Sequence, residues 1–155
     1  MTNRRRFFQS GLGLAIALAL PALASAKPTR LEVWKSPDCG CCKTWLAHLE
    51  RNGIAVGTIH DIGNTEARRA LGVPAKLGSC HTAKIDGYAI EGHVPAREIK
   101  RLLKERPAAI GLAVPGMPLG SPGMDGPDFD NQTQAHDVLL VLKDGSTRVY
   151  QSYFR

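Results

Sequence analysis

The sequence contains few sulfur-bearing and few aromatic residues. Its 155 residues include four cysteines, three methionines and 6% aromatic side chains. No internal repeat or low-complexity tract is present, which excludes a repeat architecture. The apolar run GLGLAIALALPAL, residues 11–23, is shorter than the about 20 residues that an ordinary membrane-spanning helix needs. A length of 155 residues fits one domain.

The first 26 residues have the features of an export signal. A basic stretch, MTNRRRFFQS, precedes the apolar run, and ASA at 24–26 is a small-residue cleavage site. We expect cleavage after Ala26, which leaves one periplasmic domain, residues 27–155, without stable membrane insertion. The stretch NRRRFFQ resembles a twin-arginine signal, with Arg4 and Arg5 as the pair. Sec export is the alternative route, and an uncleaved anchor is the alternative to cleavage.

Excess positive charge is scarce once the signal is removed. The whole chain has 20 basic and 14 acidic residues, for a formal net charge of +6. The signal carries three arginines and no acidic residue, so the remaining domain has a net charge of +3. This excess is too small to indicate a nucleic-acid partner.

The pattern of apolar residues and turn signals predicts an α/β domain with the order β-α-β-α-β-β-α, which is the thioredoxin-like arrangement. A C-terminal loop and β-hairpin are added, the hairpin either extending the sheet or holding the loop down. The predicted elements are strands at 31–36 and 54–62, helices at 43–53, 64–72 and 95–107, a hairpin at 80–94 turning at Asp86-Gly87, a Gly- and Pro-rich loop at 111–130, and a hairpin at 137–154 around Asp144-Gly145.

The stretch SPDCGCCKTW, residues 36–45, holds three of the four cysteines. Cys39 and Cys42 have C-x-x-C spacing at the start of the first helix, where unpaired N–H groups favour thiolate. Cys41 lies between them, and Cys80 begins the third strand. In thioredoxin-like folds the loop before that strand packs against the cysteine motif, and redox members place a cis-proline there. This chain has SCH instead, so we expect four sulfurs to converge.

Three interpretations of these cysteines remain open. Thiolates select soft ions, and Cu(I) is the soft ion that exported proteins meet, which favours a copper site, with a multinuclear cluster as its compact form. Structural zinc sites usually take two separated cysteine pairs. The second interpretation is thiol–disulfide exchange by Cys39 and Cys42, which would make the protein a thioredoxin-type oxidoreductase. The third is a module stabilised by two disulfides.

Two histidines and two methionines are further candidate ligands. His81 adjoins Cys80, and pairing of the 80–94 hairpin places His93 near the same point. The alternative role of His93 is to cap the start of the helix at 95–107. Met117 and Met124 lie in the Gly- and Pro-rich loop, where their thioethers would bind Cu(I) or would simply pack over the domain.

Three segments together resemble the CopG-type periplasmic copper-resistance proteins: CGCC, SCHTAKIDGYAIEGHVP and GLAVPGMPLGSPGM. The resemblance extends over about residues 30–154. It implies a thioredoxin-like domain that binds copper through Cys39, Cys41, Cys42 and Cys80. The implied partners are copper ions and other periplasmic copper-handling proteins. The resemblance leaves open whether the domain only binds copper or also cycles it between Cu(I) and Cu(II) as an enzyme.

Overall fold

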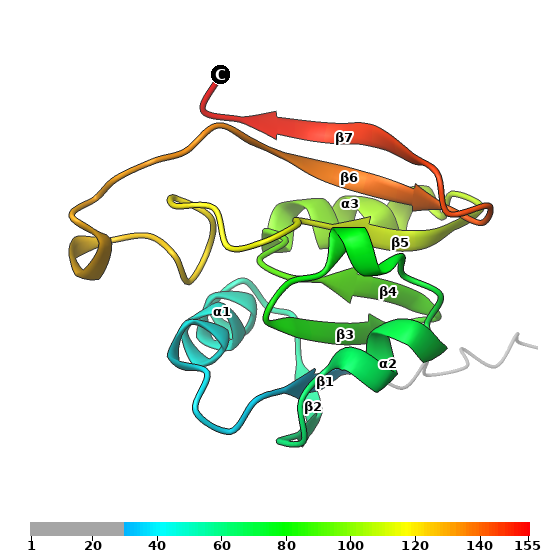
Figure 1. Cartoon of the computed structure of the whole chain (residues 1–155), viewed down its shortest axis with the longest axis horizontal. Helices are drawn as coiled ribbons and strands as arrows, with labels where there is room; N and C mark the ends of the chain where they lie inside the picture. Colours follow the sequence, from blue (N-terminus) through cyan, green and yellow to red (C-terminus); the bar gives the residue numbers. More distant parts are fainter. Residues whose placement is uncertain (1–29) are drawn as a thin grey trace, which may run out of the picture.

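A seven-stranded sheet organises residues 30–155, which are the residues described by the computed structural model (Figure 1). The expected signal at 1–26 lies outside the described residues. The elements are β1 (Leu31–Lys35), α1 (Gly40–Arg51), β2 (Val56–His60), α2 (Thr65–Ala70), η1 (Ala75–Leu77), β3 (His81–Ile85), β4 (Tyr88–Glu91), α3 (Ala96–Glu105), β5 (Ala109–Ala113), η2 (Pro127–Phe129), β6 (His136–Leu142) and β7 (Thr147–Tyr153).

The strand order is β2-β1-β3-β4-β5-β6-β7. Two pairs of neighbours, β1 with β2 and β4 with β5, are parallel and are connected by α1 and α3. Between β3 and β4, Asp86 and Gly87 both have positive φ angles, of 50° and 87°. This is the backbone of a tight hairpin turn, so the turn predicted at Asp86-Gly87 is confirmed. The thioredoxin-like α/β arrangement predicted from the sequence is also confirmed.

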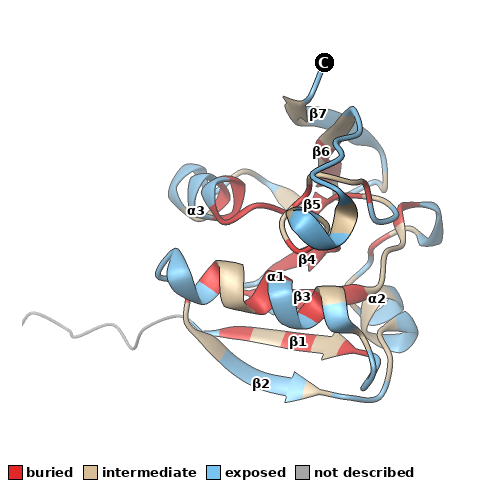
Figure 2. Cartoon of the chain, turned by 90° about the vertical axis from the view of Figure 1, so that its left-hand side faces the viewer, coloured by how far each residue is buried: buried red, intermediate tan, exposed pale blue. Residues whose placement is uncertain are grey.

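Helices cover both faces of the sheet (Figure 2). α1 and α3 lie on one face, over the main core, where Trp45, Ile90 and Leu112 are fully buried. α2 and the segment through η1 lie on the other face, over a smaller cluster that includes Val73 and Ala89. Among residues 30–155, no helix combines the length and apolarity needed to cross a bilayer.

α1 begins three residues before the helix predicted at 43–53. Its buried stripe is Cys42, Trp45, Leu46 and Leu49, which is the i, i+3, i+4, i+7 spacing of a helix face. Cys42 is the first member of this stripe, so the apolar face begins one residue before the predicted start of the helix at residue 43. The earlier start makes Cys39 the N-cap residue and places Cys41 and Cys42 in the first helical turn.

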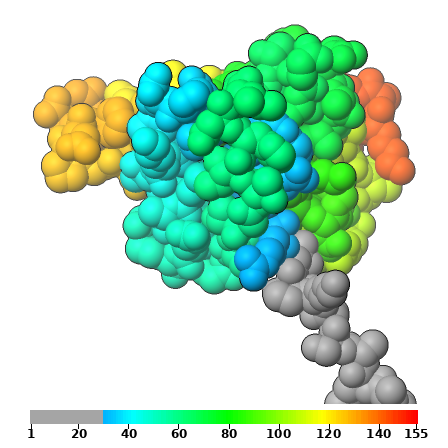
Figure 3. Space-filling model, turned by 90° about the horizontal axis from the view of Figure 1, so that it is seen from below, coloured from blue at the N-terminus to red at the C-terminus, as the bar shows by residue number. Residues whose placement is uncertain are grey.

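The prediction of a loop over 111–130 is wrong at its first three residues, because β5 extends to Ala113. Leu112 is buried in the main core and Ala113 in the smaller cluster on the opposite face, as expected for a central strand. β5 then pairs with β6, so the C-terminal hairpin extends the sheet. The segment between β5 and β6 projects beside α1, and its orange part stands out from the surface in Figure 3.

This architecture predicts that β6 is an integral part of the core. Leu140 is fully buried in the main cluster, so we expect Leu140→Ala to lower the free energy of unfolding by about 2–5 kcal/mol. Val149→Ala, on the half-exposed side of β7, is the control and should change it by less than about 0.5 kcal/mol. Denaturant unfolding measures both. Equal, small effects would mean that the hairpin is only loosely attached.

Candidate metal site

The pairing of β1 with β3 brings the two cysteine segments together. The strands run antiparallel, with Lys35 opposite His81. The cysteine loop follows Lys35 directly, and Cys80 directly precedes His81, so both lie at the same end of the strand pair. The buried Lys35 ammonium is itself held there by ion pairing with Asp61.

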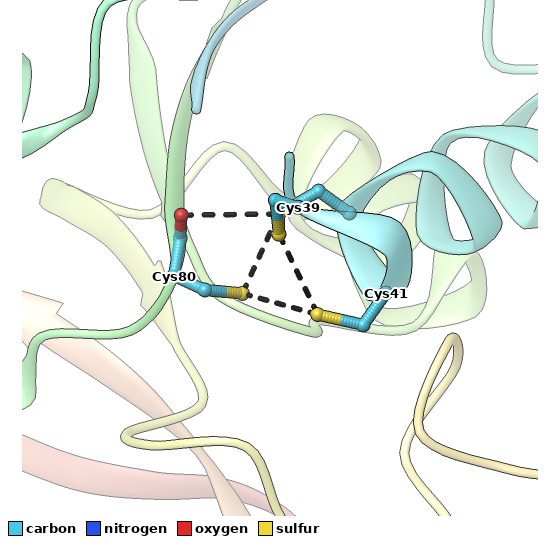
Figure 4. Close-up of side chains that lie close together, drawn as sticks. Cys39, Cys41 and Cys80 are labelled. Atoms are coloured by element: carbon cyan, nitrogen blue, oxygen red, sulfur yellow. Dashed lines mark hydrogen bonds between the residues drawn. A yellow bond between two sulfur atoms is a disulfide. The ribbon is translucent and has the colours of Figure 1, made fainter. Parts of the chain in front are cut away.

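The four cysteine sulfurs lie within 4.8 Å of one another. Cys41 Sγ is 3.5 Å from Cys39 Sγ and 3.8 Å from Cys80 Sγ, and Cys42 Sγ is 3.6 Å from Cys80 Sγ. Figure 4 shows the sulfurs of Cys39, Cys41 and Cys80 pointing toward a common centre at the start of α1. The expected convergence of the four sulfurs is therefore confirmed.

Two of these sulfurs are joined in the structure. Cys39 and Cys42 form a disulfide, and Cys41 and Cys80 are free thiols. All four cysteines lie in the described part of the chain, so the interpretation with two structural disulfides is wrong. Reduction of the single disulfide gives four thiols at one site.

Cys80 is the junction between the sulfurs and the histidines. Its Sγ is 3.1 Å from His93 Nε2 and 3.3 Å from His81 Nδ1, and these ligand atoms form a second group within 4.8 Å. Burial, together with the neighbouring Cys41, raises the pKa of the Cys80 thiol to about 12. The thiol is therefore protonated at neutral pH until a metal displaces its proton.

Both imidazoles are neutral donors at this site. Burial lowers the pKa of His81 well below its usual value, and the adjacent His93 lowers it further. Burial also lowers the pKa of His93. His93 Nδ1 donates a hydrogen bond to the Pro122 carbonyl at 2.8 Å, which leaves the lone pair of Nε2 facing Cys80. A carbonyl that fixes the tautomer of a histidine in this way is typical of metal-binding histidines.

The start of α3 uses a different histidine from the one we considered. His48 Nε2, on α1, accepts a hydrogen bond from the Ala96 N–H at 3.2 Å. His93 points instead to Cys80, so the alternative that it caps this helix is wrong. Sequence reasoning had no signal for the role of His48, because the contact joins two helices that are distant in the chain.

The Gly- and Pro-rich segment packs against the cysteine helix. A Cβ at Gly123 would lie 2.6 Å from the Cys41 carbonyl oxygen and 3.0 Å from the Trp45 nitrogen, so only glycine fits there. Met124 follows this contact and is partly buried, whereas Met117 is 50% exposed. The structure thus brings the backbone of this segment to the site, and the role of the two thioethers as ligands stays a prediction.

The same segment contacts the loop before β3, where redox thioredoxins have their cis-proline. Residues 30–155 contain no cis peptide bond. The Gly116 N–H donates to the Gly78 carbonyl at 3.0 Å, and the Ser79 hydroxyl donates to the Gly116 carbonyl. The Gly78 carbonyl and the Ser79 hydroxyl, just before Cys80, are therefore already hydrogen-bonded within the chain.

Glu91 is a site residue that the sequence reasoning missed. It is fully buried at the end of β4, and its carboxylate accepts a hydrogen bond from the Ser79 N–H at 2.7 Å. The available signal was a glutamate at the end of the apolar stretch YAI, next to the predicted partner of SCH. A charge in that position is buried only when it is paired.

Comparison with known proteins agrees with this site. A family model described as a protein of unknown function, DUF411, matches residues 77–124. Two solved structures, described as forms 1 and 2 of the copper resistance protein copG, are 44% and 43% identical to the chain, each with a TM-score of 0.74. The matches cover 82% and 83% of this chain, and 98% and 100% of those chains. No curated protein matches. The chain belongs to the CopG family of copper resistance proteins.

Proposed function

We propose that the protein binds Cu(I) as a thiolate cluster and serves copper resistance in the periplasm. The observation that carries this proposal is the convergence of four cysteine sulfurs within 4.8 Å, with two imidazoles beside them. The proposed ligands are Cys39, Cys41, Cys42, Cys80, His81, His93, Met117 and Met124. The proposed partners are copper ions and the periplasmic proteins that deliver or accept them.

The chemistry of the donor set favours copper. Thiolates and thioethers select soft ions, and a thiolate can bridge two of them. The CGCC stretch supplies three sulfurs from one helix end, unlike the two separated pairs of structural zinc sites. His81 and His93 add neutral nitrogen donors, which suit both Cu(I) and Cu(II). The copper-resistance function of the similar structures supports the same choice.

Copper loading by all four sulfurs requires the reduced protein. Opening the Cys39–Cys42 disulfide takes two electrons and two protons and gives two thiols. In the disulfide form, only Cys41 and Cys80 remain as thiols. We therefore expect the copper capacity of the protein to depend on the redox state of this pair.

Thiol–disulfide exchange is the second candidate function, and the Cys39–Cys42 disulfide is the observation that favours it. Two features oppose it. Residues 30–155 contain no substrate-guiding cis-proline, and Gly116 is hydrogen-bonded to the Gly78 carbonyl and the Ser79 hydroxyl. An incoming disulfide substrate would have to displace the chain's own loop.

Copper stoichiometry tests the proposal directly. The reduced protein, loaded with Cu(I) without oxygen, should bind more than one copper and leave few titratable thiols. The disulfide form should bind fewer. Cys41→Ser should lower the stoichiometry and not only the affinity, because a hydroxyl does not bridge soft ions as a thiolate does. Metal analysis and thiol titration measure both.

The contradicting result is less than one copper with four reactive thiols. Strong reduction of insulin disulfides by the same preparation, retained in Cys41→Ser and Cys80→Ser, would instead establish the second candidate.

The raised pKa of Cys80 predicts the pH dependence of copper binding. Its thiol must lose a proton to bind metal and is protonated throughout the neutral range, since its pKa is about 12. Affinity should therefore rise with pH, with Cys80 contributing about tenfold per pH unit. Cu(I) competition between about pH 6 and about pH 8 measures the slope. Cys80→Ser should reduce the slope by one proton, and an unchanged slope would show that Cys80 is not a thiolate ligand.

The thioethers are tested by replacing both methionines. The double variant Met117→Leu, Met124→Leu keeps bulk and apolarity but removes both sulfurs. We expect it to keep its fold and its thiolate-bound copper. It should lose Cu(I) faster to a competing chelator, or oxidise faster in air, because two soft neutral donors are gone. Unchanged retention and oxidation in a folded variant would make the methionines packing residues.

A further inference from the structure

A buried ion pair holds the backbone next to Cys80. It lies on the face of β3 and β4 that α2 covers. Glu91 Oε1 accepts hydrogen bonds from the Ser79 N–H at 2.7 Å and from Arg68 Nε at 2.8 Å. Glu91 Oε2 accepts one from the Thr82 hydroxyl at 2.6 Å. Arg68 Nη2 reaches past the carboxylate and donates to the Ser79 carbonyl at 2.7 Å. Each charge is thus compensated, as burial requires.

Asn64 completes this arrangement. It occupies the N-cap position of α2, yet its side chain makes no capping hydrogen bond there. Its Nδ2 instead donates to the Ser79 carbonyl and to the Thr82 hydroxyl, both at 3.1 Å. The N–H and the C=O of Ser79 are therefore both held by side chains.

Ser79 is packed as well as bonded. A Cβ at Gly92 would lie 2.6 Å from both Cβ and Oγ of Ser79, so the absence of a side chain there makes room for it. Gly92 has a φ of +69°, which also favours glycine. The carbonyl of Ser79 belongs to the peptide bond that begins Cys80. Hydrogen bonds and packing thus fix the orientation of the residue from which Cys80 extends.

We propose that Asn64, Arg68 and Glu91 are positioning residues for Cys80, which they hold at the meeting point of the sulfurs and the imidazoles. The three side chains touch Ser79 and are not ligands themselves. All peptide bonds of residues 30–155 are trans. The three side chains therefore fix the loop that a cis-proline fixes in redox thioredoxins. The functional meaning of this role rests on the proposed copper site, but the placement of Cys80 is measurable without copper.

Asn64→Asp separates this role from ordinary helix capping. Aspartate is as good an N-cap as asparagine, so α2 should be as stable or more stable. Aspartate has no donor for the Ser79 carbonyl, however, and would place a negative charge beside it. A capping role predicts no harm from this substitution, whereas a positioning role predicts that Cys80 becomes mobile. Arg68→Met removes two donors at once and is the stronger variant.

The readout is the alkylation rate of Cys80 relative to Cys41 in the reduced, metal-free protein, followed by mass spectrometry of the cysteine peptides. We expect the ratio to rise at least about tenfold in Asn64→Asp and further in Arg68→Met. The loss of a hydrogen bond to a charged or buried group raises the population of open loop conformations, in which Cys80 is accessible, by about that factor. Loss of Cu(I) to a chelator should accelerate in the same order.

Glu98→Gln is the matched control. Glu98 is also a buried carboxylate, but it pairs with Arg97 on α3, and its other oxygen has no partner among the described residues. This variant should change thermal stability without changing the alkylation ratio. An unchanged ratio in folded Asn64→Asp, or an equal rise in Glu98→Gln, would overturn the positioning role. If the wild-type protein fails to bind copper, the proposed function falls, while the alkylation ratio still decides the role of these residues.

Discussion

The antiparallel register of β1 against β3 is the constraint on which the site depends. Lys35 lies opposite His81, so the residues that follow β1 and those that precede β3 meet at one end of the strand pair. A slip by one residue would turn His81 to the α2 face and Thr82 toward α1, because neighbouring strand residues point to opposite faces. It would separate Cys80 from the cysteines at the start of α1. Thr82 and Glu91 are paired by the register of β3 against β4, which also brings His93 beside Cys80, so the site depends on both registers.

The site is built from groups that can be buried while neutral. The thiol of Cys80 and the imidazoles of His81 and His93 all have pKa values displaced toward their uncharged forms by burial. Such groups cost less to desolvate than ions, so the fold can form before metal arrives. A soft cation then replaces protons on sulfur. The Pro122 carbonyl, which fixes the tautomer of His93, links this chemistry to the segment that covers the cysteine helix.

Local patterns in the sequence predicted much of the fold. The Asp86-Gly87 turn has residues that accept positive φ, and the convergence of the cysteines followed from the order of the strands. The start of α1 and the strand β5 were missed because Cys42 and Leu112 reveal their burial only in the folded protein. The roles of His48, Asn64 and Glu91 depend on partners 12 or more residues away. Periodicity contains no information about such hydrogen bonds.

X-ray absorption at the copper edge, on the reduced protein loaded with Cu(I) in the absence of oxygen, tests the central claim most directly. A thiolate cluster predicts a Cu(I) edge, a coordination shell dominated by sulfur, and scattering from a neighbouring copper. A shell dominated by nitrogen and oxygen, or sulfur ligation without a neighbouring copper, would contradict a cluster assembled from the four converging cysteines.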